Sequence, residues 1–159
     1  MRAVALILTL ALAACGRGPE PLGAPVGLRD RGVPISSTTR GDARSLVGDW
    51  VIGVSLAGSG ATRAGTAVSI LPSGSGLEWR IGGERLATTS SGPGRFVARD
   101  GTELWLLWVD DDFRTAVIGS PDGRIGFVMD RNGAASTDRT AAALRILDFN
   151  GYDPADFAG

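Results

Sequence analysis

Residues 104–131 read LWLLWVDDDFRTAVIGSPDGRIGFVMDR, and this stretch decides the fold. It contains three short apolar runs rich in β-branched and aromatic residues, at 104–109, 113–119 and 125–129. Two groups of turn-forming residues separate the runs, the acidic triplet 110–112 and SPDGR at 120–124. The pattern predicts three consecutive antiparallel strands. Such a meander has unpaired edges, so it must close on itself or be covered.

The sequence on either side continues the pattern. Five further strands are expected upstream, at 50–56, 65–71, 76–81, 84–89 and 95–99. The segment 76–81 alternates cleanly, with Leu77, Trp79 and Ile81 on one face. Downstream, residues 136–150 have helical periodicity, Ser136 or Thr137 as N-cap, and Gly151 placed to end the helix.

Three short motifs at the corners of these strands resemble lipocalin signatures. Gly48-Asp49-Trp50 fits the Gly-x-Trp that begins the first strand of that family. VDDDFRTAVIG resembles the second signature, an acidic turn before an aromatic residue and a strand, and GFVMDRNG resembles the third, a strand closing on Arg. Gly151-Tyr152-Asp153 is similar to the tail of bacterial lipocalins. The motifs occur in the family order between residues 46 and 157.

The resemblance implies an all-β fold, an eight-stranded antiparallel up-and-down β-barrel with one C-terminal α-helix. It also implies that Trp50 closes one end of the barrel with Arg131 packed over its ring, a contact that contributes about 0.5–2 kcal/mol. The acidic turn would lie at the same end. The structural signature residues are Gly48, Trp50, Asp110, Phe113 and Arg131.

Strand parity predicts which side chains line the barrel. If Arg131 points inward, Met129, Phe127 and Ile125 share its face, because side chains alternate along a strand. The family pattern places Thr115 inward as well. The predicted ligand-lining residues are Val68, Ile70, Trp79, Leu104, Leu106, Trp108, Val117, Ile125 and Phe127. The alternative is that these side chains fill the interior. A register error of one residue would exchange the two faces.

The N-terminus resembles a bacterial lipoprotein signal. A positive start and an apolar run lead to Leu-Ala-Ala-Cys, and Cys15 is the only cysteine of the chain. We expect residues 1–14 to be removed and Cys15 to carry acyl chains such as palmitate. Residues 15–45 should then form a flexible Gly- and Pro-rich tether, and residues 46–159 should fold. Gly16 favours an outer-membrane anchor that faces the periplasm. The alternative is an ordinary secretory signal with an incidental cysteine.

Composition argues against several other classes of function. The chain of 159 residues contains no His and one Cys, so the usual activators of a nucleophile are missing. Its Arg residues are scattered rather than clustered, which argues against nucleic-acid binding. The triplet 110–112 could attract a cation, but acids on a hairpin turn are usually a solvated corner. We therefore expect that the protein is not an enzyme and has no metal or other cofactor. We also expect it to be a monomer.

Two functions remain. In the first, the protein is a membrane-anchored lipoprotein that binds a small hydrophobic or amphipathic ligand, a fatty acid or lysophospholipid, in a β-barrel calyx for envelope lipid storage or transport. In the second, it is a filled small β-barrel lipoprotein that acts through its surface or N-terminal segment, as a protease-inhibitor-like or interaction protein. An open apolar interior favours the first function and a packed one favours the second.

Overall fold

The structure is a computed structural model that describes residues 29–40, 43–57, 60–133 and 135–159. The predicted signal peptide, Cys15 and the first half of the predicted tether therefore lie outside the described residues. Within the described part, no helix is both long and apolar enough to cross a membrane.

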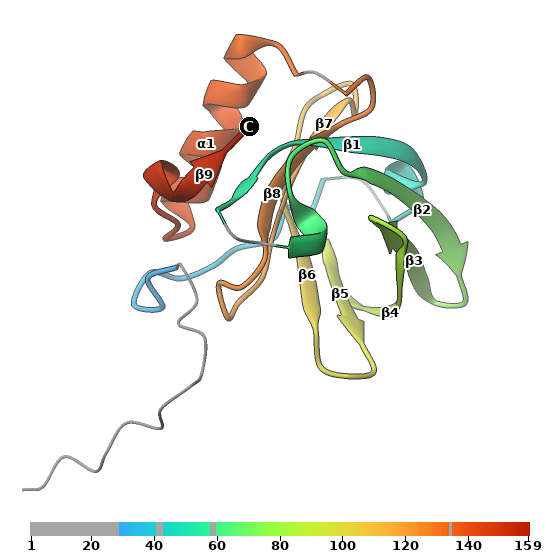
Figure 1. Cartoon of the computed structure of the whole chain (residues 1–159). Helices are drawn as coiled ribbons and strands as arrows, with labels where there is room; N and C mark the ends of the chain where they lie inside the picture. The colour runs from blue at the N-terminus through green and yellow to red at the C-terminus, as the bar shows by residue number, and fades with distance from the viewer. Residues whose placement is uncertain (1–28, 41–42, 58–59, 134) are drawn as a thin grey trace, which may run out of the picture.

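Eight antiparallel strands form the barrel (Figure 1). They are β1 (Gly48–Leu56), β2 (Ala67–Ser73), β3 (Gly76–Ile81), β4 (Glu84–Gly92), β5 (Arg95–Ala98), β6 (Glu103–Val109), β7 (Thr115–Gly119) and β8 (Gly126–Asp130). Each strand pairs with the next along the chain, and β1 closes the barrel by pairing with both β2 and β8. The predicted up-and-down barrel is confirmed.

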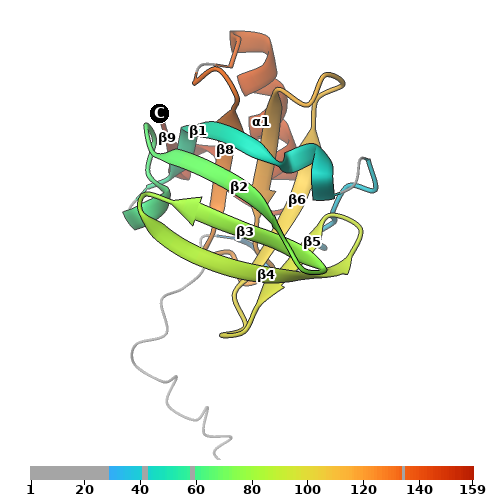
Figure 2. The same cartoon turned by 90° about the vertical axis from the view of Figure 1, so that its right-hand side faces the viewer.

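The two ends of the barrel differ. The 3-10 helix η1 (Ala43–Leu46) enters the fold beside Trp50, and we call this the closed end. We call the opposite end the mouth; the connections β1–β2, β3–β4, β5–β6 and β7–β8 surround it. The β3–β4 connection is only Gly82-Gly83, and both residues have positive φ, 58° and 91°, a conformation that glycine adopts without steric cost. Figure 2 shows the strands β1 to β4 in front and the helix α1 behind them.

Helix α1 (Thr137–Phe149) packs on the outside of the barrel against β6, β7 and β8 (Figure 1). Ser136 caps its first turn by accepting a hydrogen bond from the Arg139 N–H, and Gly151 follows its end with φ 87°. The predicted C-terminal helix is therefore confirmed. A short strand, β9 (Phe157–Ala158), pairs with the mouth end of β1, and the sequence did not predict it.

The segment 29–38 packs against the folded domain, and we call it the N-terminal strap. The Asp30 N–H donates to Gly151 O at 2.7 Å, and the Thr38 N–H donates to Leu106 O at 2.8 Å. Arg29 is buried, and its Nε donates to Asn150 O at 2.6 Å. The prediction of a flexible tether is therefore wrong for this segment. The composition of the strap did not predict this packing, because the strap is held by backbone groups of the barrel and of the helix end.

Candidate functional site

The closed end is built on Trp50 and Arg131. The Arg131 guanidinium carbon lies 4.0 Å from the centroid of the Trp50 ring. Arg131 also donates hydrogen bonds to Phe113 O and Ser45 O, both at 2.8 Å, and to Val47 O. The Trp50 ring is buried, and its Nε1 donates to Leu46 O at 2.8 Å. One cation therefore ties the start of β1, the end of β8 and the β6–β7 turn together, as predicted.

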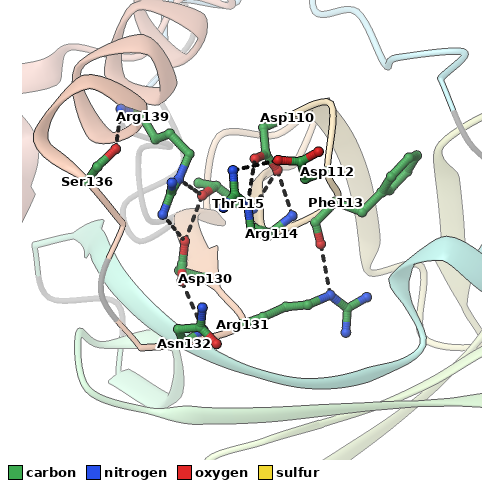
Figure 3. A network of polar contacts seen from close by, with 10 residues as sticks. All are labelled: Asp110, Asp112, Phe113, Arg114, Thr115, Asp130, Arg131, Asn132, Ser136 and Arg139. Atoms are coloured by element: carbon green, nitrogen blue, oxygen red, sulfur yellow. Dashed lines mark hydrogen bonds and ion pairs between the residues drawn. The ribbon is translucent and has the colours of Figure 1, made fainter.

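The remaining signature residues shape the backbone around Arg131. Gly48 has φ 121°, and a Cβ at this position would lie 2.8 Å from Arg131 Nη1. Asp110 Oδ1 accepts the Arg114 and Thr115 N–H groups at 2.6 and 2.7 Å, which holds the acidic turn closed. Phe113 has φ 54° in this turn, so β7 begins at Thr115 rather than at the predicted residue 113. Figure 3 shows the Phe113 carbonyl facing Arg131.

The barrel interior is an apolar cluster to which seven of the nine predicted lining residues belong. Those seven are Val68, Ile70, Trp79, Leu104, Leu106, Ile125 and Phe127. The same cluster holds inward residues that the prediction omitted: Ile52, Phe96, Ala116 and Ile118. The alternation in β5 could have identified Phe96, because Arg95 and Val97 on either side of it are less buried.

Trp108 and Val117 lie outside the barrel, so their predicted placement in the lining is wrong. They are paired with each other and belong to the cluster beneath helix α1. For Trp108 the cause is a bulge in β6, where the register shifts between Leu106 and Trp108. A bulge inserts one extra residue and reverses the facing of the later residues of its own strand, so Trp108 faces outward and Val109 inward. On β7, Ala116 and Ile118 pair with the inward residues Met129 and Phe127 of β8, so Thr115 and Val117 face outward.

The inward side chains fill the interior. The buried members of the inner cluster are between 0 and 7% exposed. Trp79 and Phe96 contact each other edge to face across it, with ring centroids 5.7 Å apart. Two hollows of about 480 and 420 Å³ lie on the outside instead, one lined by Leu56, Arg63 and Gly159 and the other beside Trp108 and the acidic turn. A ligand can occupy the interior only if side chains move aside.

Charge in the described part is kept out of this interior. Its buried charged residues are Arg29, Asp110 and Asp130, and none belongs to the inner cluster. Asp130 lies beneath α1, where its Oδ2 accepts hydrogen bonds from Thr115 Oγ1 at 2.7 Å and from Arg139 Nη2 at 3.3 Å (Figure 3). Burial alone would raise the pKa of Asp130. The hydrogen bonds and the charge of Arg139 outweigh burial and hold that pKa below its ordinary value.

The tail motif has a structural role at the mouth. The Tyr152 hydroxyl accepts the Ser120 N–H at 2.8 Å and donates to Ile125 O at 2.6 Å, which fixes the β7–β8 turn. Gly119 and Gly126 leave room for its side chain, because a Cβ on Gly119 would lie 2.9 Å from the Tyr152 hydroxyl oxygen and one on Gly126 would lie 3.1 Å from ring carbon Cε1. Burial raises the pKa of this phenol, so it stays protonated as a donor.

The acidic turn shows the contacts of a solvated corner. Asp112 forms an ion pair with Arg114 at 2.6 Å, and Asp111 forms one with Arg40. In the part of the chain that the structure describes, no three Cys, Asp or Glu side chains are grouped so that they could hold a metal ion.

Comparison with known proteins identifies the fold. No protein-family model matches the sequence, and no curated protein matches it. The chain is similar to the solved structure of insecticyanin from the tobacco hornworm Manduca sexta, with 13% identity, a TM-score of 0.55, and coverage of 80% of this chain and 84% of the other. For lobster apocrustacyanin A1 the identity is 12%, the TM-score 0.52, and the coverage 79% and 88%.

A third similar structure is the siderocalin Ex-FABP, with 16% identity, a TM-score of 0.51, and coverage of 72% of this chain and 92% of the other. All three proteins are lipocalins. At these identities the likeness concerns the fold. The closed barrel, the external C-terminal helix and the Trp50–Arg131 contact agree with it, and the chain has the lipocalin fold.

Proposed function

We propose that this protein is a binding protein without catalytic chemistry, which takes a small apolar or amphipathic ligand into its barrel through the mouth. The observation that carries the proposal is the inner wall: a closed barrel whose buried lining in the described residues carries no charge and is apolar except for Thr88, whose hydroxyl already donates to Leu77 O. Such a lining gains about 0.8 kcal/mol for each methylene group that it removes from water. Fatty acyl compounds, including fatty acids and lysophospholipids, are the ligand class that we infer.

The packed interior sets a condition on binding. Because the lining is closed in the structure, the ligand must displace side chains, and the affinity falls by the cost of that rearrangement. Some side chains of the lining toward the mouth are not fully confined, since Leu86 and Ile125 are only partly buried. Loose packing at the mouth supports access from that end. The siderocalin Ex-FABP is described as functioning through dual ligand specificities, which supports ligand binding as a use of this fold.

We further propose that Cys15 carries the lipid anchor and holds the domain at the bacterial outer membrane, facing the periplasm. The support is the sequence around Cys15, with its positive start, apolar run and Leu-Ala-Ala-Cys. The strap begins at Arg29, beside the β7–β8 connection at the mouth. An anchored domain of this kind could store lipids or pass them on as a monomer.

The packed interior also favours the second candidate, a filled barrel that acts through its surface or N-terminal segment as an interaction or protease-inhibitor-like protein. On this account the strap and the segment before it carry the function. The two candidates differ in one respect that can be measured, because only the first requires a ligand inside the barrel.

The deciding experiment titrates the folded, lipid-stripped protein with fatty acids, lysophospholipids and an apolar dye. Calorimetry measures the binding of each ligand. We expect saturable one-to-one binding of at least one ligand. Ala98→Trp should abolish it, because Ala98 shares the facing of the inward Phe96 on β5, lies at the mouth end of that strand and is 7% exposed. Ala87→Arg is the control, since Ala87 is exposed on the outer face opposite Glu78.

If the folded protein binds none of these ligands, or if both variants bind as the wild type does, the interior is not the site. The filled-barrel account then replaces the first.

A further inference from the structure

Trp79 has a buried polar atom that no protein group satisfies. Its ring lies in the middle of β3 and is 0% exposed. Among the buried side-chain nitrogen and oxygen atoms of the described residues, only Trp79 Nε1 lacks a hydrogen-bond partner. Two other indoles of the chain are satisfied: Trp50 Nε1 donates to Leu46 O and Trp105 Nε1 to Glu103, each at 2.8 Å.

An unpartnered donor destabilises the fold, because folding removes its hydrogen bond to water and returns nothing. Phenylalanine would keep the aromatic packing at this position without that cost. A buried water is a poor substitute, since an ordered water needs two to four polar partners. The side chains around Trp79 are apolar: Ile70 and Leu86 lie opposite it on the neighbouring strands, and Phe96 touches its ring.

We infer that the Trp79 N–H is the donor that recognises the ligand, and that the ligand is an apolar molecule with a neutral oxygen acceptor, such as a ketone, ester or alcohol. This inference rests on the proposed function, because it requires a ligand inside the barrel, and it narrows the proposed fatty acyl class to members with a neutral acceptor, such as the ester of a lysophospholipid, over free fatty acids. The ligand oxygen would accept the hydrogen bond that the protein leaves open, while its hydrocarbon part displaces the inner side chains.

The charges around the barrel interior favour a neutral acceptor over a carboxylate. The buried charged residues of the described part include one cation, Arg29, which lies at the helix end, and Arg131 at the closed end already donates to three backbone carbonyls. Around the mouth, Arg63, Arg99 and Arg124 are balanced by Glu84, Asp100 and Asp122, so the rim adds no net positive charge. A carboxylate at the depth of Trp79 would be buried without a counter-ion, which is strongly unfavourable.

The neighbouring wall provides a route to Trp79. Strand β5 is only four residues long, and its mouth end carries the small side chain of Ala98, which is 7% exposed. Phe96, on this strand, is the ring that contacts Trp79. Rotation of Phe96 would open space beside the indole without breaking the pairing of the longer strands.

The test compares Trp79→Phe with Trp105→Phe in the full chain. Trp105 is the matched control, because its indole N–H bonds to Glu103 on the outer face. Three probes share a hydrocarbon chain: 2-dodecanone with a neutral acceptor, dodecane with none, and dodecanoate with a carboxylate. Dissociation constants are measured for each protein, and the indole N–H signals of the four Trp residues are followed by NMR.

We expect Trp79→Phe to weaken 2-dodecanone binding about 3- to 10-fold, the effect of one neutral hydrogen bond, and to leave dodecane binding unchanged. Trp105→Phe should change neither. In the wild type, 2-dodecanone should move the indole signal that Trp79→Phe removes, and dodecane should move it less. The expected order of affinity places dodecanoate below 2-dodecanone.

Equal loss of dodecane and 2-dodecanone binding in Trp79→Phe would overturn the inference, because it would mean that the ring packs against ligands without donating. Unchanged 2-dodecanone binding would overturn it as well. Both results leave the proposed function standing. If the wild type binds none of the three probes, the inference fails, and the titration with fatty acids, lysophospholipids and an apolar dye then decides the proposed function by itself.

Discussion

The contact between Trp50 and Arg131 gives the sharpest prediction about stability. Trp50 is 1% exposed, so Trp50→Ala should destabilise the domain by about 3–5 kcal/mol, the cost of removing a buried aromatic side chain. Arg131→Ala should cost about 2 kcal/mol, because it removes charge-assisted hydrogen bonds to carbonyl groups that water can partly replace. The two changes should couple, since the guanidinium lies 4.0 Å from the ring centroid.

The assay is a double-mutant cycle measured by urea unfolding and followed by far-ultraviolet circular dichroism, which does not depend on the removed indole. A partly shielded cation–π pair predicts a coupling of about 1–2 kcal/mol. Arg95 and Trp105 form the control pair, 4.2 Å apart on the outer face, and should couple by about 0.5–1 kcal/mol. Additivity of Trp50→Ala and Arg131→Ala within about 0.3–0.5 kcal/mol would refute the reasoning.

Three further predictions concern the anchor, the polar network under α1 and the strap. Cys15→Ser should lose acyl label and stay uncleaved or become soluble, and acyl chains retained on the mutant would contradict the lipoprotein proposal. The stabilising effect of Asp130 is present above its unfolded pKa of about 3.9 and is lost as the pH falls through its lower folded pKa. The unfolding free energy of the wild type should therefore fall more steeply below pH 4 than that of Asp130→Asn, and parallel curves in acid titrations would argue against this. Arg29→Ala should destabilise the domain by about 1–3 kcal/mol in urea, because it leaves Asn150 O and Pro121 O without their donor, and an unchanged midpoint would show that the strap adds no stability.

The strands and the closed end could be predicted because their signals are local. Alternation identified β3 and β8 with their inward faces, and the three motifs located Trp50 and Arg131. Gly48 of the first motif has a physical reason, because Arg131 Nη1 approaches its backbone so closely that a Cβ would not fit.

The errors arose where a tertiary contact or an irregularity decided the outcome. The bulge at Leu107 reverses the facing of Trp108, and the run LWLLWV contains no glycine or proline that would mark it. The outward facing of Val117 follows from the pairing of β7 with β8, which parity within β7 alone does not reveal. The strap is held by hydrogen bonds to backbone groups such as Gly151 O, which composition cannot reveal. The two residues of β9 are too few for a periodic signal.

Methyl NMR of the folded protein, during titration with an acyl ligand, shows whether the ligand enters the barrel. We predict that the inward methyl groups of Ile70, Ile118 and Met129 shift and that the shifts saturate at one ligand per protein. Val117 and Val128 are the internal controls, because they belong to the same strands but pack beneath α1, and their signals should move little. Shifts confined to Val117 and Val128, or no saturable shift at all, would contradict binding inside the barrel.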